Sequence, residues 1–319
     1  MSKKALKTYE EQLNILKNRN LKILNERKAK KILSIESYYA LINGYKDIFL
    51  ESFKSEIYQE NVYFENIFML FNFDRELRMI LLKYILIVER TIKTKISYHF
   101  SMKYDDKYLN ANNFDYNNRK KNLKIPRLIY NMSKVKRIYS EVNSSIYHYQ
   151  EIHGKIPLWV LVEKLNFGII SHFFYCLILK DQNAIVKEIF EDYKEEYNYN
   201  KKSILNPAET SKILFFICDF RNKCAHDERI YQHKHKFASG KSPNPFIFKD
   251  KNIKFNNDVF ALIVSLKIFL IKENYIEMIN KINELISKLP ALLPNHYKKI
   301  LNKMSFSNDW ENIMLEIIK

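Results

Sequence analysis

The chain contains 319 residues and carries a formal net charge of +17, with a pI near 9.4. Hydrophobic residues make up 47% of it, which suffices for a packed core. Its 4 Gly and 7 Pro are few for an all-β or loop-rich protein, so we expect an all-α fold. The charge favours a polyanionic partner, either nucleic acid or an anionic membrane surface, although the abundance of Lys, Asn, Ile and Tyr is also the pattern of an AT-rich genome.

The cysteines and the apolar runs argue against several other classes of protein. Cys176, Cys218 and Cys224 show no Cys-x-x-Cys spacing, so we expect no zinc site and no disulfide framework, and a cytoplasmic location. The first residues lack the apolar region of a secretion signal, and the apolar run 259–271 is shorter than the ~20 residues that cross a bilayer. We therefore expect no membrane partner.

The N-terminal segments predict helices. Residues 6–33 are amphipathic, as one helix or a pair, and include a basic cluster at 27–31 that is either an RNA-facing patch or a solvated helix face. The tyrosine-rich segment 34–50 predicts a helix that ends near Gly44 and packs its rings against neighbouring elements.

The most regular helical pattern covers residues 63–104. Asp74 can act as an N-cap there, and we interpret Glu89 and Arg90 as structural. The Asn-rich, basic segment 105–127 then breaks the pattern, which predicts a loop that can also contact phosphates.

Helical periodicity returns at residues 128–150. Pro157 is expected to begin a further helix, Trp159 to anchor it, and Gly168 to end it or to pack tightly. Residues 169–197 predict two amphipathic helices.

The next helix, predicted at 207–227, has the clearest local signals. Asn206 can cap it, Pro207 suits its first position, and Glu209 stands where a capping box needs an acid. Apolar residues at helical spacing then form a stripe that should face the core: Ile213, Phe216, Ile217, Phe220 and Cys224.

A polar arc lies beside that stripe. Arg221, Asn222 and His226 fall within ~140° of the helix circumference, separated by small residues. A guanidinium, an amide and an imidazole on one rigid element have the character of a functional site. The structural alternative is that cations near a helix C-terminus favour its dipole and pair with nearby acids.

The last part of the chain carries weaker signals. Residues 231–257 are expected to be irregular, and their His233 and His235 fit a basic loop better than a metal site, since no third ligand is near. Helices are expected at 258–289 and 297–317, and no metal or cofactor is expected.

Three stretches carry a family resemblance. They are Ser-Tyr-Tyr to Gly-Tyr at 37–45, Pro-Leu-Trp-Val to Phe-Gly at 157–168, and Arg-Asn-Lys-Cys-Ala-His at 221–226 with Arg229. In this order they resemble the Abi-like abortive-infection proteins of the AbiD/AbiF kind, within the HEPN superfamily, over most of residues 8–232.

The resemblance implies an HEPN-type helical bundle with additional N- and C-terminal helices. It also implies a metal-independent endoribonuclease of phage defence, in which one Arg-x(4–6)-His motif from each subunit of a homodimer builds a composite site. A structured noncoding RNA is an expected partner. We divide the chain into four parts, with one continuous domain as the alternative: 1–104, the basic loop 105–127, the HEPN-like region 128–257, and the C-terminal helices 258–319.

The chemistry of RNA cleavage fits the residues of the motif. His226 can move protons to and from the 2′-hydroxyl and the leaving oxygen, Arg221 can stabilise the phosphorane, and Asn222 can orient either group. Lys223 and Arg229 are candidate phosphate contacts. Two other functions remain open: an RNA-binding protein that does not cleave but forms a ribonucleoprotein complex, and an HEPN partner that a nucleotidyltransferase modifies.

Overall fold

The computed structural model describes residues 6–52, 54–140, 145–306 and 310. The expected all-α fold is confirmed, because the described residues contain helices and two isolated bridges, Lys22 with Tyr63 and Leu50 with Tyr58, but no strand. In chain order the α-helices are α1 (Tyr9–Asn18), α2 (Glu26–Glu36), α3 (Phe64–Tyr104), α4 (Arg119–Asn122), α5 (Lys124–Ser140), α6 (Ser145–His153), α7 (Leu158–Leu161), α8 (Phe167–Cys176), α9 (Leu179–Tyr197), α10 (Pro207–Ala225), α11 (Phe246–Asp250), α12 (Val259–Leu266), α13 (Lys272–Ser287), α14 (Leu289–Leu292) and α15 (Tyr297–Lys303). Short π or 3-10 turns are η1 (Tyr39–Asn43), η2 (Lys46–Ile48), η3 (Ala111–Asn113) and η4 (Val162–Lys164).

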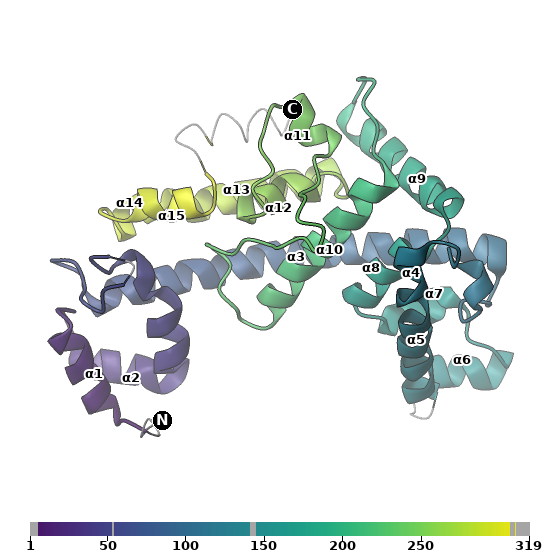
Figure 1. Ribbon diagram of the computed structural model, residues 1–319. Helices are drawn as coiled ribbons and strands as arrows, with labels where there is room; N and C mark the ends of the chain where they lie inside the picture. The colour runs from purple at the N-terminus through teal and green to yellow at the C-terminus, as the bar shows by residue number, and fades with distance from the viewer. Residues whose placement is uncertain (1–5, 53, 141–144, 307–309, 311–319) are drawn as a thin grey trace.

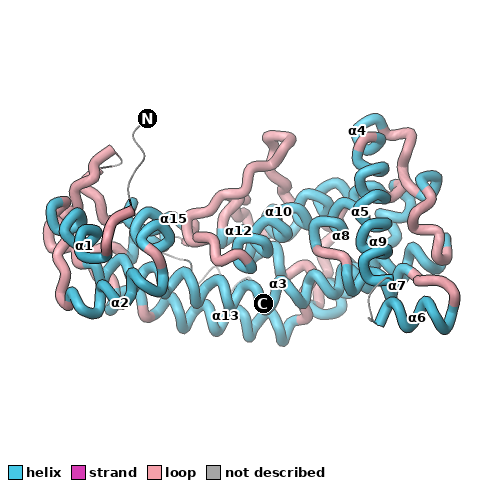
Figure 2. Tube along the Cα trace, turned by 90° about the horizontal axis from the view of Figure 1, so that it is seen from below, coloured by secondary structure: helices cyan, strands magenta, loops and turns pink. Residues whose placement is uncertain are grey.

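The long helix α3 is the spine of the molecule. Its 41 residues span about 60 Å at the usual helical rise. Figure 1 shows α1 and α2 at one end of it and α4 to α8 at the other, with α10 crossing between them. Helix α13 lies alongside α3, as Figure 2 shows from below. Helices α7, α8, α9, α10, α12 and α13 all contact α3, so the middle of the fold is organised along this one helix.

The sequence of α3 explains why it can run so long. Apolar residues recur along it at helical spacing, and the expected stripe continues past Val88 through Ile92, Ile96 and Phe100, all of which are buried. They belong to one core cluster that extends from Leu13 to Trp310. Within the described residues, none of the helices has both the length and the apolar character that a membrane crossing requires.

Several elements differ from the sequence-based predictions. Within the expected loop 105–127, residues Arg119–Asn122 are helical and α5 already begins at Lys124. Pro126 is tolerated there because the first helical turn leaves backbone N–H groups without helical acceptors. A short helix, α11, also interrupts the region 231–257. The helix expected at 297–317 is described only as α15, because residues 307–309 and 311–319 lie outside the described part.

Trp159 does not anchor its helix, contrary to the prediction. Its side chain is 50% exposed, whereas Leu158 and Leu161 on either side of it are buried. In a helix of only four residues, the two leucines occupy the inward face and Trp159 points outward. Pro157 does directly precede the first residue of this helix, as expected.

Candidate functional site

Helix α10 begins and packs as its sequence predicts. The Asn206 side chain accepts a hydrogen bond from the Glu209 backbone N–H at 2.9 Å and donates from its own amide to the Glu209 carboxylate at 2.7 Å. All five residues of the predicted apolar stripe are buried. The helix is thus fixed at its start and along one face, which makes its other face a stable platform.

Arg221 lies on that other face and forms an ion pair with Glu89 of α3. The Arg221 Nε donates to Glu89 Oε2 at 3.3 Å, and Glu89 also pairs with Lys93 Nζ at 2.9 Å. The Glu89 side chain is 7% exposed, while that of Arg221 is 26% exposed. Because only Nε is engaged, the two terminal nitrogens of the guanidinium have no partner among the described residues.

Asn222 and His226 are both exposed on the same side of α10. The Asn222 amide makes only a long contact with Cys218 Sγ, at 3.9 Å, and the His226 imidazole has no hydrogen-bond partner within the described part of the chain. His226 is the last residue of the helical hydrogen-bond pattern, since its N–H donates to the Asn222 carbonyl at 2.9 Å. The backbone of His226 is therefore fixed, while its imidazole ring is exposed and can contact a substrate.

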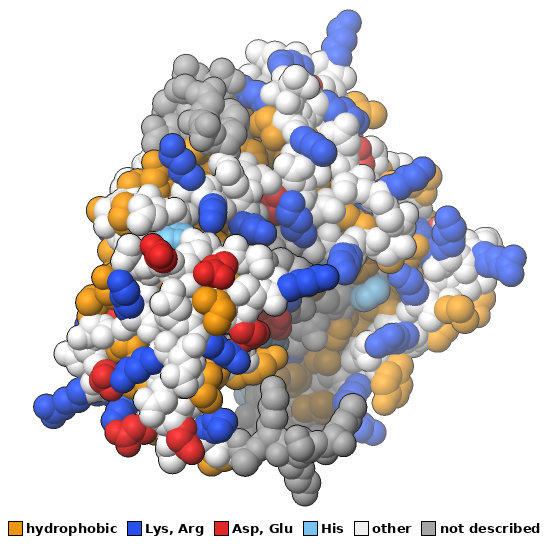
Figure 3. All heavy atoms as spheres, turned by 60° about the vertical axis from the view of Figure 1, so that its left-hand side comes forward, with side chains coloured by type: hydrophobic (Ala, Val, Ile, Leu, Met, Phe, Trp, Pro, Cys, Tyr) orange, Lys and Arg blue, Asp and Glu red, His pale blue; other side chains and the backbone are white. Residues whose placement is uncertain are grey.

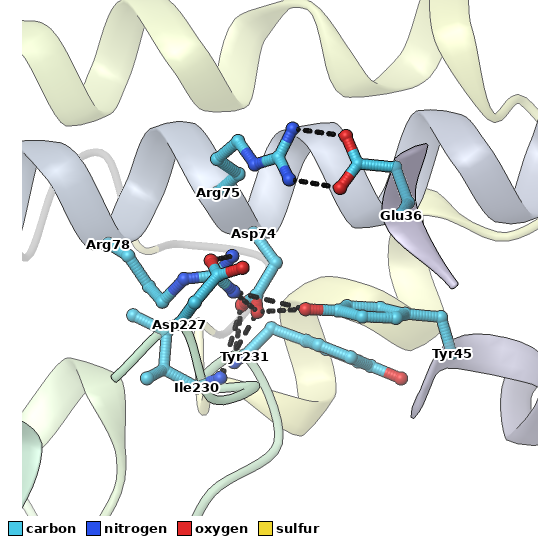
Figure 4. Close-up of polar contacts among 8 residues, drawn as sticks. All are labelled: Glu36, Tyr45, Asp74, Arg75, Arg78, Asp227, Ile230 and Tyr231. Carbon is cyan, nitrogen blue, oxygen red and sulfur yellow. Dashed lines mark hydrogen bonds and ion pairs between the residues drawn. The ribbon is translucent and has the colours of Figure 1, made fainter. Parts of the chain in front are cut away.

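The chain turns sharply after His226. Asp227 adopts the left-handed conformation, with φ at 56°, and the Glu228 N–H returns to the Lys223 carbonyl at 2.9 Å. The bond from Glu228 to Lys223 is one of the two that define a Schellman motif, in which glycine is the usual left-handed residue. The Asp227 carboxylate compensates by pairing with Arg78 Nη2 of α3 at 2.5 Å (Figure 4).

A buried network fixes the segment that follows the turn. Asp74 is fully buried, and its carboxylate accepts hydrogen bonds from Tyr45 Oη at 2.6 Å, Arg78 Nη1 at 2.6 Å and the Tyr231 N–H at 2.7 Å. It also accepts from the Ile230 N–H at 3.1 Å (Figure 4). The prediction of Asp74 as an N-cap is wrong, because α3 begins ten residues earlier, at Phe64. Its carboxylate instead caps backbone groups of a loop that is distant in the sequence.

Lys223 and Arg229 both have partners within the protein. Lys223 Nζ pairs with Glu228 at 2.8 Å. Arg229 donates to the Gly44 carbonyl and lies 3.3 Å from an Asp47 carboxylate oxygen. RNA binding by these two side chains stays a prediction. The contacts of Arg229 with Gly44 and Asp47 link the N-terminal segment to the turn, which is a structural reason for an arginine at this position.

The three sequence stretches that carry the resemblance meet around α10. The first reaches the turn through Gly44 and Tyr45, as just described. The second reaches the helix through Gly168, where an added Cβ would lie 3.8 Å from Cys218 Sγ and only 3.2 Å from Asn166 Oδ1. Gly168 lies in the first turn of α8, so tight packing, and not a helix end, is the correct one of the two expectations.

Asp219 was not anticipated as part of the site. It lies two turns before His226 on the same face of α10, and its Oδ2 contacts His233 Nε2 at 2.7 Å and His235 Nδ1 at 2.8 Å. Burial by itself raises the pKa of Asp219, but the two histidine hydrogen bonds outweigh this and hold the pKa well below its usual value. No trio of His, Cys, Asp or Glu side chains in the described residues is arranged to hold a metal ion.

The cysteines of α10 do not contribute a nucleophile. Cys218 and Cys224 are both free and buried. Burial raises the pKa of Cys218 to about 11 and that of Cys224 to about 12, so both remain thiols at neutral pH. The reactive groups that this face can offer are thus the Arg221 guanidinium, the Asn222 amide and the His226 imidazole.

Comparison with known proteins identifies the family. The family described as Abi-like protein matches residues 31–232, which is more than half of the chain and includes all three stretches around α10. No curated protein and no solved structure matches the chain. On the strength of the family match, the chain belongs to the Abi-like proteins.

Proposed function

We propose that this protein is an HEPN-type endoribonuclease of phage defence, whose site combines Arg221, Asn222 and His226 from two identical subunits. Membership of the Abi-like family associates the chain with abortive infection. The observation that carries the proposal is that Asn222 and His226 are exposed and Arg221 is partly exposed on one fixed face, while the buried Glu89 pairs with Arg221 Nε. A purely structural arginine would use its terminal nitrogens within the protein, as Arg78 does.

The residues divide the chemistry of cleavage between them. RNA supplies its own nucleophile, the 2′-hydroxyl, which attacks the adjacent phosphorus once its proton is removed. His226 accepts or donates the proton, because a histidine ring can act as a general base or a general acid. The free nitrogens of Arg221 stabilise the negative charge that develops on the non-bridging oxygens. Asn222, one turn before His226, orients the imidazole or the phosphate. The products then carry 2′,3′-cyclic phosphate and 5′-hydroxyl ends.

Each subunit supplies a single motif histidine, His226, whereas the reaction needs one group to take a proton from the 2′-hydroxyl and another to protonate the 5′ oxygen. A symmetric dimer supplies both histidines and two arginines. The exposed end of α10 offers a surface on which such a pair can form.

The direct test is cleavage of labelled tRNA and mRNA by the purified protein. We expect cleavage in the presence of EDTA, and a loss of at least ~10²-fold in His226→Ala and Arg221→Ala. Matched controls are His148→Ala and Arg27→Ala, which remove exposed side chains of the same types from α6 and α2. Full activity of His226→Ala, or a requirement for a divalent metal, would refute the proposal.

Subunit mixing tests the composite site separately. If both histidines of a dimer are needed, an equal mixture of wild-type and His226→Ala subunits retains about one quarter of the wild-type activity per total protein. Independent sites would retain about one half. A monomer at the concentrations of the assay would exclude the composite site.

A non-cleaving RNA-binding protein is the alternative function. The net charge of +17 favours tight association with RNA whether or not the bound RNA is cut. Tight binding of tRNA or mRNA without cleavage by the wild-type protein, with binding unchanged in His226→Ala, would favour this alternative.

A further inference from the structure

A basic groove runs between α5 and α8, apart from the three motif residues. It has a volume of about 570 Å³. Its α5 wall carries Lys124, Arg127 and Lys134, and its α8 wall includes the first helical turn, with Gly168, and His172. The three cations follow the helical spacing i, i+3, i+10, so they form a stripe about 15 Å long.

The charge of this groove is not neutralised by the protein. Residues 119–140 contain eight Lys and Arg and no Asp or Glu, and one of the eight, Lys121, pairs with Asp115 outside this range at 2.9 Å. Lys124, Arg127 and Lys134 are exposed, and none of them forms an ion pair within the described residues. By contrast, four other grooves in the described part of the chain each include at least one carboxylate on their walls.

His172 lies in the groove, and its pKa is affected by the positive charge there. Its pKa is lowered first by burial and then by the nearby Lys124 and Arg127, so the ring is neutral at neutral pH. Its ring also packs against Phe215 of α10, with centroids 4.9 Å apart. The groove is therefore in direct contact with the helix that carries the motif.

The contact with Phe215 aligns the groove with the motif residues. Phe215, Asn222 and His226 lie within about 40° of one another around α10, because they are separated by seven and eleven residues. The rise between Phe215 and His226 is about 16 Å. A polymer that leaves the groove along this face would pass Asp219, whose carboxylate is held by His233 and His235, and then Asn222 before it reaches His226.

We propose that the α5–α8 groove binds the sugar-phosphate backbone of single-stranded RNA and directs it to the Arg221–His226 face. The three cations contact successive phosphates, and amides of Asn131 and Asn166 in the groove walls can contact ribose hydroxyls or base edges. Apolar side chains between them, Leu128, Val135 and Ile169, accommodate bases without sequence preference. The concave, elongated shape fits a polymer better than a flat membrane surface.

The choice of RNA as the occupant rests on the proposed function, but binding is measured without cleavage. The probe is a fluorescein-labelled oligouridylate, and every variant is made in the His226→Ala background. We expect the triple variant Lys124→Gln/Arg127→Gln/Lys134→Gln to bind at least ~10-fold more weakly. We also expect the slope of log affinity against log salt to fall by about 2, which is roughly 0.7 for each lost phosphate contact on a single strand.

The control must distinguish RNA binding in this groove from general electrostatic attraction of RNA to a basic protein. Cations are spread widely over other faces too, as Figure 3 shows for the N-terminal end of the molecule. The triple variant Arg27→Gln/Lys28→Gln/Lys31→Gln removes the same residue types and the same charge from the exposed basic cluster of α2. It should change the salt slope by less than one. Equal losses in the two triple variants would overturn the proposal, as would binding to phosphatidylserine vesicles but not to RNA.

A second measurement avoids any effect of the substitutions on folding. Bound oligouridylate should protect Lys124 and Lys134 of the unsubstituted groove from amine acetylation, read by mass spectrometry, and leave Lys28 and Lys31 reactive. Equal reactivity of Lys124 and Lys134 with and without RNA would refute the proposal that RNA binds in the groove. Absence of cleavage by the wild type, combined with protection of Lys124 and Lys134, would instead refute the proposed nuclease activity and support RNA binding in the groove.

Discussion

Residues 221–226 and 227–231 are neighbours in the chain, but the structure uses their polar groups in different ways. In the first segment, the side chains of Asn222 and His226 are exposed and nearly free of internal partners. In the second, the Asp227 side chain and the backbone of residues 230 and 231 are bound by Arg78 and Asp74 of α3. The polar groups of the second segment thus hold the C-terminal end of α10 in place, which leaves the side chains of Asn222 and His226 available.

The most severe way to break this arrangement is Asp74→Ala. It leaves the Arg78 guanidinium buried without its main counterion, and it removes the acceptor of two backbone N–H groups and of Tyr45 Oη. We expect the free energy of unfolding to fall by about 3–5 kcal/mol, measured by urea denaturation.

Asp192→Ala is the matched control for that substitution. Asp192 pairs with Lys95 at 2.6 Å, but its side chain is 59% exposed. Exposed ion pairs contribute about 1 kcal/mol or less. A loss of similar size in the two variants would contradict the central role that we assign to the buried network.

Glu89→Gln tests the other side of the comparison, the support of the motif itself. Glutamine keeps the shape but loses the charge that orients Arg221, so we expect a fall of up to ~10²-fold in the rate constant for cleavage, with a small change in KM. In an Arg221→Lys background, which lacks the guanidinium Nε, the added effect of Glu89→Gln should largely disappear. An undiminished effect there would mean that Glu89 acts on stability and not through Arg221.

Local signals in the sequence were sufficient for one part of the site and not for the other. The caps and periodicity of α10 are features of consecutive residues, so the helix and the outward position of Arg221, Asn222 and His226 were predictable. Asp74 was misread because its partners Tyr45 and Ile230 lie 29 and 156 residues away. The interpretation of Glu89 as structural agrees with its buried ion pairs, but its pairing with Arg221 could not be predicted, since this contact exists only once α10 crosses α3. The proposed four-part division of the chain stays a prediction.

Asp227→Ala and Asp227→Gly separate the two roles of the turn residue. Both variants lose the ion pair with Arg78, but alanine also bears the cost of a left-handed conformation, which is about 1–2 kcal/mol. We expect the glycine variant to be the more stable of the two by about 1 kcal/mol in urea denaturation, and to cleave RNA faster. Identical behaviour of the two variants would show that the backbone conformation at this position does not constrain His226.

Asp219→Asn probes a weaker link, between α10 and the loop after these two segments, where His233 and His235 contact the motif face of α10. The pKa of Asp219 is lowered in the folded protein, so its contribution to stability is complete above about pH 4, the ordinary pKa of an unfolded Asp, and is lost as the pH falls further. Because the side chain is 32% exposed, solvent screening limits this contribution to about 1 kcal/mol or less. Urea denaturation of wild type and variant at neutral and acidic pH should therefore give a difference that shrinks as the wild-type carboxylate becomes protonated. A difference that stays constant down to low pH would mean that the charge of Asp219 is not what holds the two histidines against α10.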